Sequence, residues 1–162
     1  MLVGSLSSNF YGVPRSTLDA DLVIELGSRN LASVLEGLKD RVRLDPQMVF
    51  ETVTMSRALR ADIVGMDFTI EFFLLGDDPY HQERFRRRRR VPYYGRDVCF
   101  PTREDVVVQK VRWARPKDVE DIRGILAVQG DDAFDWDYIH RWTEIHGTRA
   151  LLDEIRASIP EI

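Results

Sequence analysis

The chain has 162 residues, of which 44% are hydrophobic and 31% charged, a composition typical of one globular domain and atypical of a disordered chain. No apolar run approaches the roughly 20 residues that a membrane-spanning helix needs, so we expect no membrane segment, and we expect no signal peptide. The single cysteine, Cys99, excludes an internal disulfide, and no cysteine and histidine set suits structural zinc. These features predict a protein of the reducing cytoplasm.

The net charge of -4 conceals an uneven distribution of charge. Arg84 and the run from Arg86 to Arg90 place six arginines within seven positions, in a chain that is otherwise acidic. Such a run could bind RNA or a polyphosphate. The slight aromatic content around it favours the alternative, a solvated helix end that balances the acidic C-terminal part.

The first part of the chain predicts alternating strands and helices. Residues 1–3 are apolar and predict a short strand, which a short helix over 6–11 follows. Residues 18–26 alternate strictly between two faces, one of them wholly apolar, and this period predicts a strand. Ser28 has the chemistry of an N-cap and predicts a helix that continues to about Asp40.

The middle of the chain predicts further strands. Alternation over 67–75 predicts a second well-defined strand, with weaker strand patterns at 48–51 and 61–64. A Gly-Asp-Asp-Pro turn ends the strand over 67–75 and precedes a predicted short helix over 80–87. Residues 91–94 and 97–100, separated by a glycine-containing turn, predict a small hairpin.

The remainder of the chain predicts helices. Thr102 with Asp105 forms a capping-box-like start for a helix through Trp113, and Pro116 suits the first turn of the next. Two more helices are expected around 139–145 and 151–155. The predicted class is therefore α+β, with a core over 1–100 and a helical region over 101–162 packed on it as one compact domain.

Three carboxylates are candidates for a metal site. Asp19 and Asp21, two residues apart on a strand, leave the same face and could bind one divalent ion or two. Glu71 lies in the middle of an apolar strand and is the expected third ligand, with Asp67 as the fallback. Oxygen ligands suit Mg²⁺ or Mn²⁺. The alternative is that the aspartate pair, or Glu71, simply faces solvent.

Gly4 and Ser5 provide a second element of a possible site. They stand between a predicted strand and a predicted helix, where backbone N–H groups, a hydroxyl and the helix dipole favour a phosphate. Arg15 could contact a phosphate or form a salt bridge with a strand carboxylate. Lys110 could reach a triphosphate, although a solvated helix lysine is the favoured interpretation.

These motifs together resemble the polymerase-β-type nucleotidyltransferase superfamily. Residues 2–5, then Asp19-Ala20-Asp21-Leu22 after thirteen further residues, resemble its signature, and residues 11–21 are similar to its small bacterial members related to toxin–antitoxin and abortive-infection systems. Residues 68–73 resemble the strand of the third metal ligand, which is usually aspartate and here is Glu71. Parts of 102–122 resemble the helical region, so the resemblance covers roughly residues 1–130.

The resemblance implies a nucleotidyltransferase-like mixed β-sheet flanked by helices and a metal-dependent transfer of a nucleoside monophosphate from an NTP to a hydroxyl. It implies that Gly4 and Ser5 position the triphosphate and that Asp19, Asp21 and Glu71 are the catalytic metal ligands, with Mg²⁺ or Mn²⁺ as cofactor. The acceptor would be a protein, an RNA or a small molecule. Two alternatives stay open: a non-catalytic, antitoxin-like module that binds a protein partner, and an RNA-binding protein that uses the Arg84–Arg90 run.

Overall fold

Six of the strands form one mixed sheet, and the other two form a separate hairpin. The structure, a computed structural model, describes residues 1–159. The strands are β1 (Leu2–Val3), β2 (Asp19–Ile24), β3 (Val42–Leu44), β4 (Val49–Glu51), β5 (Ser56–Ile63), β6 (Thr69–Leu74), β7 (Arg89–Tyr93) and β8 (Arg96–Phe100). The order in the sheet is β1-β2-β6-β5-β3, and β4 also pairs with β5. Only β2 and β6 run parallel; the other pairs are antiparallel.

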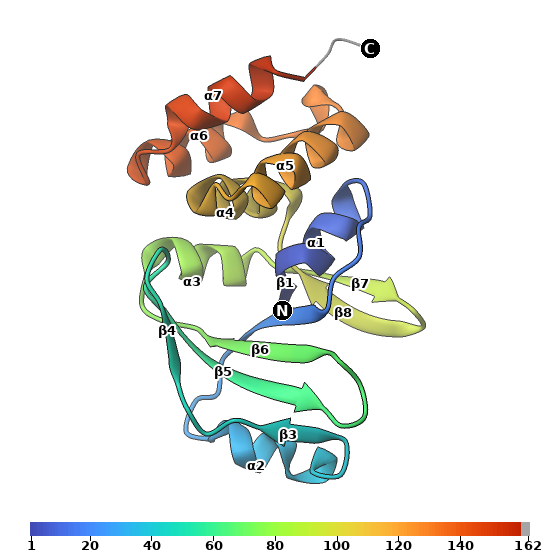
Figure 1. Ribbon diagram of the computed structural model, residues 1–162. Coiled ribbons are helices and arrows are strands. Elements are labelled where there is room, and N and C mark those ends of the chain that lie inside the picture. Colours follow the sequence, from blue (N-terminus) through green and yellow to red (C-terminus); the bar gives the residue numbers. More distant parts are fainter. Residues whose placement is uncertain (160–162) are drawn as a thin grey trace.

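The helices lie on both faces of this sheet. They are α1 (Gly4–Tyr11), α2 (Leu31–Leu35), α3 (Pro79–Arg86), α4 (Arg103–Trp113), α5 (Pro116–Gln129), α6 (Trp136–Ile145) and α7 (Arg149–Ala157), with 3-10 turns at Glu36–Leu38 and Asp131–Ala133. In Figure 1, α2 lies below the sheet, α1, α3 and α4 lie above it, and α5, α6 and α7 stack further up. The fold is α+β with a helical C-terminal half, which confirms the predicted class.

Two apolar clusters correspond to these layers. The alternating residues of β2 and β6 place Leu22, Ile24 and Phe72 against α2 in the smaller cluster. The larger cluster joins α1, α3 and α4 to the C-terminal helices through side chains such as Val107 and Ile122. Since the period of a strand is two, the other face of β2 and β6 remains for the residues between these apolar ones, and the carboxylates are among them.

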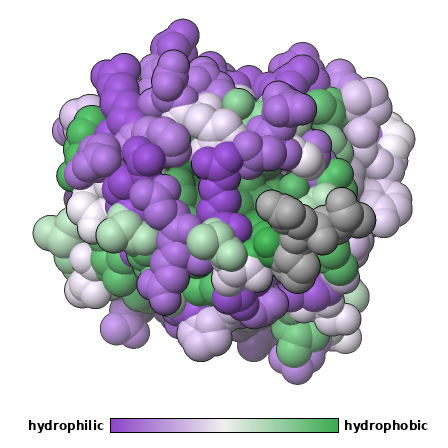
Figure 2. Space-filling model, turned by 90° about the horizontal axis from the view of Figure 1, so that it is seen from above, coloured by the Kyte–Doolittle hydropathy of each residue, from purple (hydrophilic) through white to green (hydrophobic). Residues whose placement is uncertain are grey.

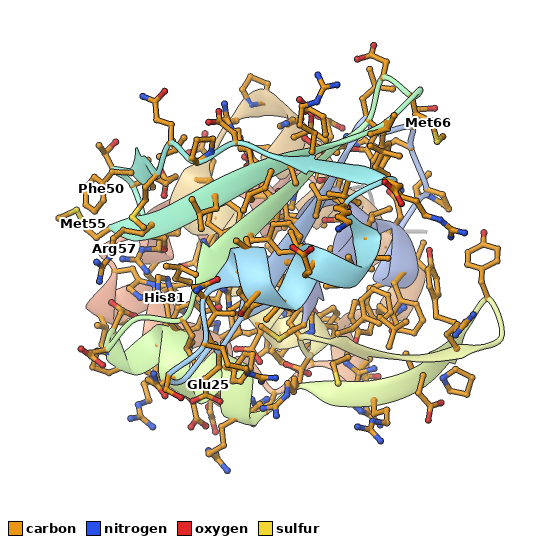
Figure 3. The ribbon with its side chains drawn as sticks, turned by 90° about the horizontal axis from the view of Figure 1, so that it is seen from below. Glu25, Phe50, Met55, Arg57, Met66 and His81 are labelled. Atoms are coloured by element: carbon orange, nitrogen blue, oxygen red, sulfur yellow. The ribbon has the colours of Figure 1, made fainter. Side chains whose placement is uncertain are left out.

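Figures 2 and 3 show the molecule from above and from below. Seen from above, over the C-terminal helices, hydrophilic residues cover most of the surface, with hydrophobic residues between them (Figure 2). At the opposite side of the molecule, Phe50, Met55 and Arg57 lie at one end of the β4–β5 hairpin and Met66 at the other end of β5 (Figure 3). No helix within residues 1–159 has both the length and the apolar composition that crossing a membrane requires.

Two expectations about local structure were wrong. The helix after β2 begins at Leu31, because Asn30 and not Ser28 is its N-cap: the Asn30 side chain accepts a hydrogen bond from the Ser33 backbone N–H at 2.8 Å. The helix is also short and changes to a 3-10 turn at Glu36. Strand β3 was missed because three residues are too few to show a period.

The arginine run does not form one solvated helix end. It begins on α3, passes the helix terminus and continues into β7, so its arginines belong to two different elements. Arg84 is buried, with 7% of its surface exposed. Arg87 pairs with Glu104 and Asp105 at 3.7 Å and 3.4 Å. The expectation of a solvated run is therefore wrong for Arg84 and Arg87.

Candidate active site

The three predicted carboxylates lie on neighbouring strands and on one face of the sheet. In the parallel pair of β2 and β6, Asp19 is opposite Thr69 and Asp21 is opposite Glu71. Residues opposite each other in a ladder point to the same face, and so do residues two apart on one strand. Asp19, Asp21 and Glu71 therefore share the face that α1 and α4 cover, and all three line one small cavity.

Asp21 contacts the start of α1, and this contact explains the glycine at position 4. Gly4 has a φ of +59°, and a Cβ atom on it would lie 1.7 Å from the Asp21 Oδ2 atom. Only glycine combines this backbone conformation with this close approach. Burial, reinforced by the negative charges of Asp19 and Glu71, raises the pKa of Asp21 to about 6.

The donor atoms of this cluster suit a hard divalent cation, but they are not arranged as a finished metal site. Glu71 accepts a hydrogen bond from Arg60 Nε of β5 at 2.7 Å, and Asp19 accepts one from the Thr17 hydroxyl. Within residues 1–159, no three histidine, cysteine, aspartate or glutamate side chains are grouped closely enough to hold one ion. All-oxygen ligands and the mutual repulsion felt by Asp21 fit Mg²⁺ or Mn²⁺. Such an ion would compete with Arg60 for Glu71.

A buried ion-pair network lies beside the carboxylates. Lys110 of α4 donates to Asp118 at 2.9 Å and to Asp121 at 2.6 Å, both on α5. Arg15 donates to both carboxylate oxygens of Asp121, at 2.7 Å and 3.0 Å, and also to the Ser5 hydroxyl at 2.9 Å. The network thus ties the first turn of α1 to α4 and α5.

The protonation states of this network follow from its hydrogen bonds. Burial by itself would raise the pKa of Asp121, but hydrogen bonds from Arg15 and Lys110 hold it below its ordinary value. The pKa of Asp118 is set in the same way: burial would raise it, but hydrogen bonds from Arg115 and Lys110 hold it below its ordinary value. The expectation of a solvated Lys110 was wrong, because only 4% of it is exposed. Arg15 pairs with a helix carboxylate and not with a strand carboxylate.

The structure brings most of the predicted residues together in one cavity. It is lined by Gly4, Ser5, Asp19, Asp21, Glu71, Lys110, Trp113, Arg115 and Lys117. Arg15 is not among the lining residues, but its guanidinium donates a hydrogen bond to the hydroxyl of Ser5, which is. Arg115 and Lys117 were not predicted; the proline between them marks the turn from α4 to α5, and both basic residues flank that turn. The cavity therefore joins acidic side chains on the sheet to basic ones on the helices.

Comparison with solved structures gives a similar fold, although comparison of the sequence gives no match. No family model matches the chain, and no curated protein matches it in sequence. The crystal structure of an antigenic nucleotidyltransferase-like protein from Paracoccidioides brasiliensis superposes with a TM-score of 0.53 and 16% identity, over 99% of this chain and 85% of that one. The fold is thus nucleotidyltransferase-like, as the sequence motifs predicted.

Proposed function

We propose that the protein is a metal-dependent nucleotidyltransferase that moves a nucleoside monophosphate from an NTP to a hydroxyl acceptor. One observation carries the proposal: the carboxylates of β2 and β6 face the same cavity as the first turn of α1 and the basic residues of α4 and α5. A metal–nucleotide needs carboxylates for the ion and positive groups for the phosphates. The nucleotidyltransferase-like fold supports the same class of reaction.

The roles of the residues follow from their positions. Asp19, Asp21 and Glu71 would hold Mg²⁺ or Mn²⁺, which when bound neutralises phosphate charge and favours ionisation of a hydroxyl. Gly4 and Ser5 position the triphosphate at the positive end of α1. Lys110, whose Nζ is held by Asp118 and Asp121, fixes α4 against α5 at the edge of the cavity. The exposed Arg115 and Lys117, which also line the cavity, would supply positive charge to the phosphates.

The reaction itself is a substitution at the α-phosphorus. The acceptor oxygen forms a bond to this phosphorus, the bond to the bridging oxygen of the β-phosphate breaks, and pyrophosphate leaves. A carboxylate of the cluster takes the hydroxyl proton. Most of the acceleration would come from positioning and from electrostatic stabilisation of the developing charge. We also predict that the protein acts in the cytoplasm and that it is related to toxin–antitoxin systems.

The test uses NTPs labelled at the α-phosphate, with Mg²⁺ or Mn²⁺ and RNA, protein or small-molecule acceptors. Asp21→Asn removes one central carboxylate. Asp67→Asn is the matched control, because this aspartate, the fallback for the third ligand, is exposed just before β6 and does not line the cavity. We expect label transfer by the wild type and by the control only. Label transfer by Asp21→Asn at the wild-type rate would overturn the assignment of Asp21 to the active site. If the wild type binds neither NTP nor metal, the non-catalytic binding module replaces the enzyme.

A further inference from the structure

A second cavity lies beside the proposed active site, between the sheet and helices α3 and α4. We call it the side cavity. It shares Gly4, Asp21 and Lys110 with the first cavity, so the two are adjacent. Its walls are mostly apolar and include Val23 and Phe73. It is narrow, with a volume of about 40 Å³, so it suits a slender ligand with few polar groups.

Two buried polar side chains of α3 line this cavity without full hydrogen bonding. Arg84 is 7% exposed and His81 is 6% exposed. Arg84 donates from Nη1 to Gln109 Oε1 at 2.8 Å, but its Nε has no hydrogen-bond partner among residues 1–159. The Nε2 atom of His81 also has none in that part of the chain. Figure 3 shows His81 on the same side of the molecule as the β4–β5 hairpin.

No acidic side chain neutralises Arg84 in the described part of the chain. Asp105 lines the same cavity, but its carboxylate accepts hydrogen bonds from Tyr138 at 2.6 Å and Thr102 at 2.8 Å and faces Arg87. A buried cation without a counter-ion is costly, because the protein does not replace the lost hydration. The usual partner of such a guanidinium is an oxyanion, which it binds through two parallel hydrogen bonds.

Two other polar side chains of the side cavity, His81 and Trp113, carry no charge at neutral pH. Burial, with a further contribution from the positive charge of Arg84, lowers the pKa of His81 to about 4, so His81 is neutral at neutral pH. The indole N–H of Trp113 also lines the cavity and has no hydrogen-bond partner within residues 1–159. Of the other ionisable residues of the side cavity, Lys110 and Asp21 belong to the part shared with the first cavity, and Asp105 is bound by Tyr138, Thr102 and Arg87. The groups left to accompany Arg84 are neutral, which suits a single acidic group of a ligand.

We infer that the side cavity is the acceptor subsite and takes a small molecule with an apolar body and one oxyanion, a carboxylate or a phosphate, paired with Arg84. Its hydroxyl would lie at the other end, next to Asp21. The assignment as an acceptor subsite rests on the proposed function, while the oxyanion site itself does not. It narrows the acceptor to a small molecule, since a narrow cavity between the sheet and two helices excludes a folded protein or an RNA duplex.

Binding without nucleotide or metal tests the oxyanion site directly. The probes are butyrate, propyl phosphate and the neutral butyramide, measured by ligand-observed NMR at constant ionic strength. We expect the wild type to bind butyrate or propyl phosphate at least tenfold more tightly than butyramide. The anion that binds more tightly identifies the preferred acidic group as a carboxylate or a phosphate. Equal affinity for butyramide, or no binding of either anion, would overturn the inference.

Three variants assign the effect to one residue. Arg84→Gln should abolish the preference for anions, Arg84→Lys should retain part of it, and Arg88→Gln, which removes an exposed arginine of the same run, should leave it unchanged. Because the Arg84 charge has no acidic partner in the part of the chain that the structure describes, Arg84→Gln should unfold at a temperature no lower than the wild type. A lower unfolding temperature with an unchanged anion preference would show that Arg84 serves packing alone.

The subsite and the proposed reaction can fail separately. Anion binding that depends on Arg84, in a protein that transfers no label to any acceptor, would overturn the nucleotidyltransferase proposal and keep the oxyanion site. Transfer of label to RNA or protein by Arg84→Gln at the wild-type rate would keep the reaction and overturn the acceptor subsite.

Discussion

Asp21→Asn is expected to stabilise the metal-free protein at neutral pH, although it removes a residue of the proposed active site. The pKa of Asp21 rises from its ordinary 3.8 to about 6, first because of burial and then because of Asp19 and Glu71. A difference of one in pKa corresponds to about 1.4 kcal/mol, so ionised Asp21 costs the native state up to about 3 kcal/mol. Asparagine keeps the shape of the side chain without the charge and so avoids most of this cost.

The sign of the pH dependence follows from the same shift. Asp21 binds its proton more tightly in the native state than in the unfolded state, so between about pH 4 and pH 6 the native state holds more protons. The free energy of unfolding therefore falls as the pH rises through this range, and the full cost is present above it. At about pH 4, where the native state is protonated and the unfolded state is only partly ionised, most of this cost is absent and Asp21→Asn should change stability little.

Urea unfolding in EDTA at pH 7.5 and pH 4 measures this difference. We expect Asp21→Asn to raise the free energy of unfolding by about 1–3 kcal/mol at the higher pH only. The exposed Asp67→Asn should have no effect at either pH. Equal destabilisation by Asp21→Asn at both pH values would refute the reasoning, since it would show that the Asp21 carboxylate is favourably bound in the native state.

Gly4→Ala should destabilise the protein by about 2 kcal/mol or more, because of the close approach to Asp21, whereas Gly27→Ala, with a similar positive φ but open space, should cost only about 1 kcal/mol; equal losses in urea unfolding would contradict the close approach. Lys110→Met should cost about 2–3 kcal/mol, because Asp118 and Asp121 each lose one of their two cationic partners while Arg115 and Arg15 remain. Lys117→Met, at an exposed lysine, should lower label transfer with little change in stability. A large loss of stability in Lys117→Met, with none in Lys110→Met, would show that Lys117 and not Lys110 holds the helices together. Arg60→Gln should tighten Mg²⁺ binding several-fold in calorimetry by releasing its glutamate partner on β6; weaker binding would show that the ion pair helps to build the site.

Part of the site could be predicted because it depends only on local order in the chain. The period of two in β2 places Asp19 and Asp21 on one face whatever the strand pairs with. The glycine at position 4 and the Thr102 cap are also local signals, and Thr102 does accept a hydrogen bond from the Asp105 backbone N–H at 3.3 Å. The two-residue alternation over 67–75 likewise identified the strand that carries Glu71.

The positions of the charged helix residues could not be predicted in this way. A lysine on a helix is usually solvated, and the sequence around Lys110 contains nothing that would distinguish it. Its burial depends on Asp118 and Asp121, which α5 carries into contact with α4. Arg84 presents the same difficulty, because it belongs to a run whose other members are mostly exposed.

By itself, therefore, the sequence determined the class of fold, the face on which the aspartate pair lies and the oxygen-rich character of the site. Only the tertiary structure decided that β2 and β6 pair in parallel and set Asp21 opposite Glu71. It also decided that Lys110 is buried and that Arg84 lies in the side cavity without an acidic partner among residues 1–159. The physical reason is that a period is a property of neighbouring residues, whereas burial and ion pairing depend on which distant segments pack together.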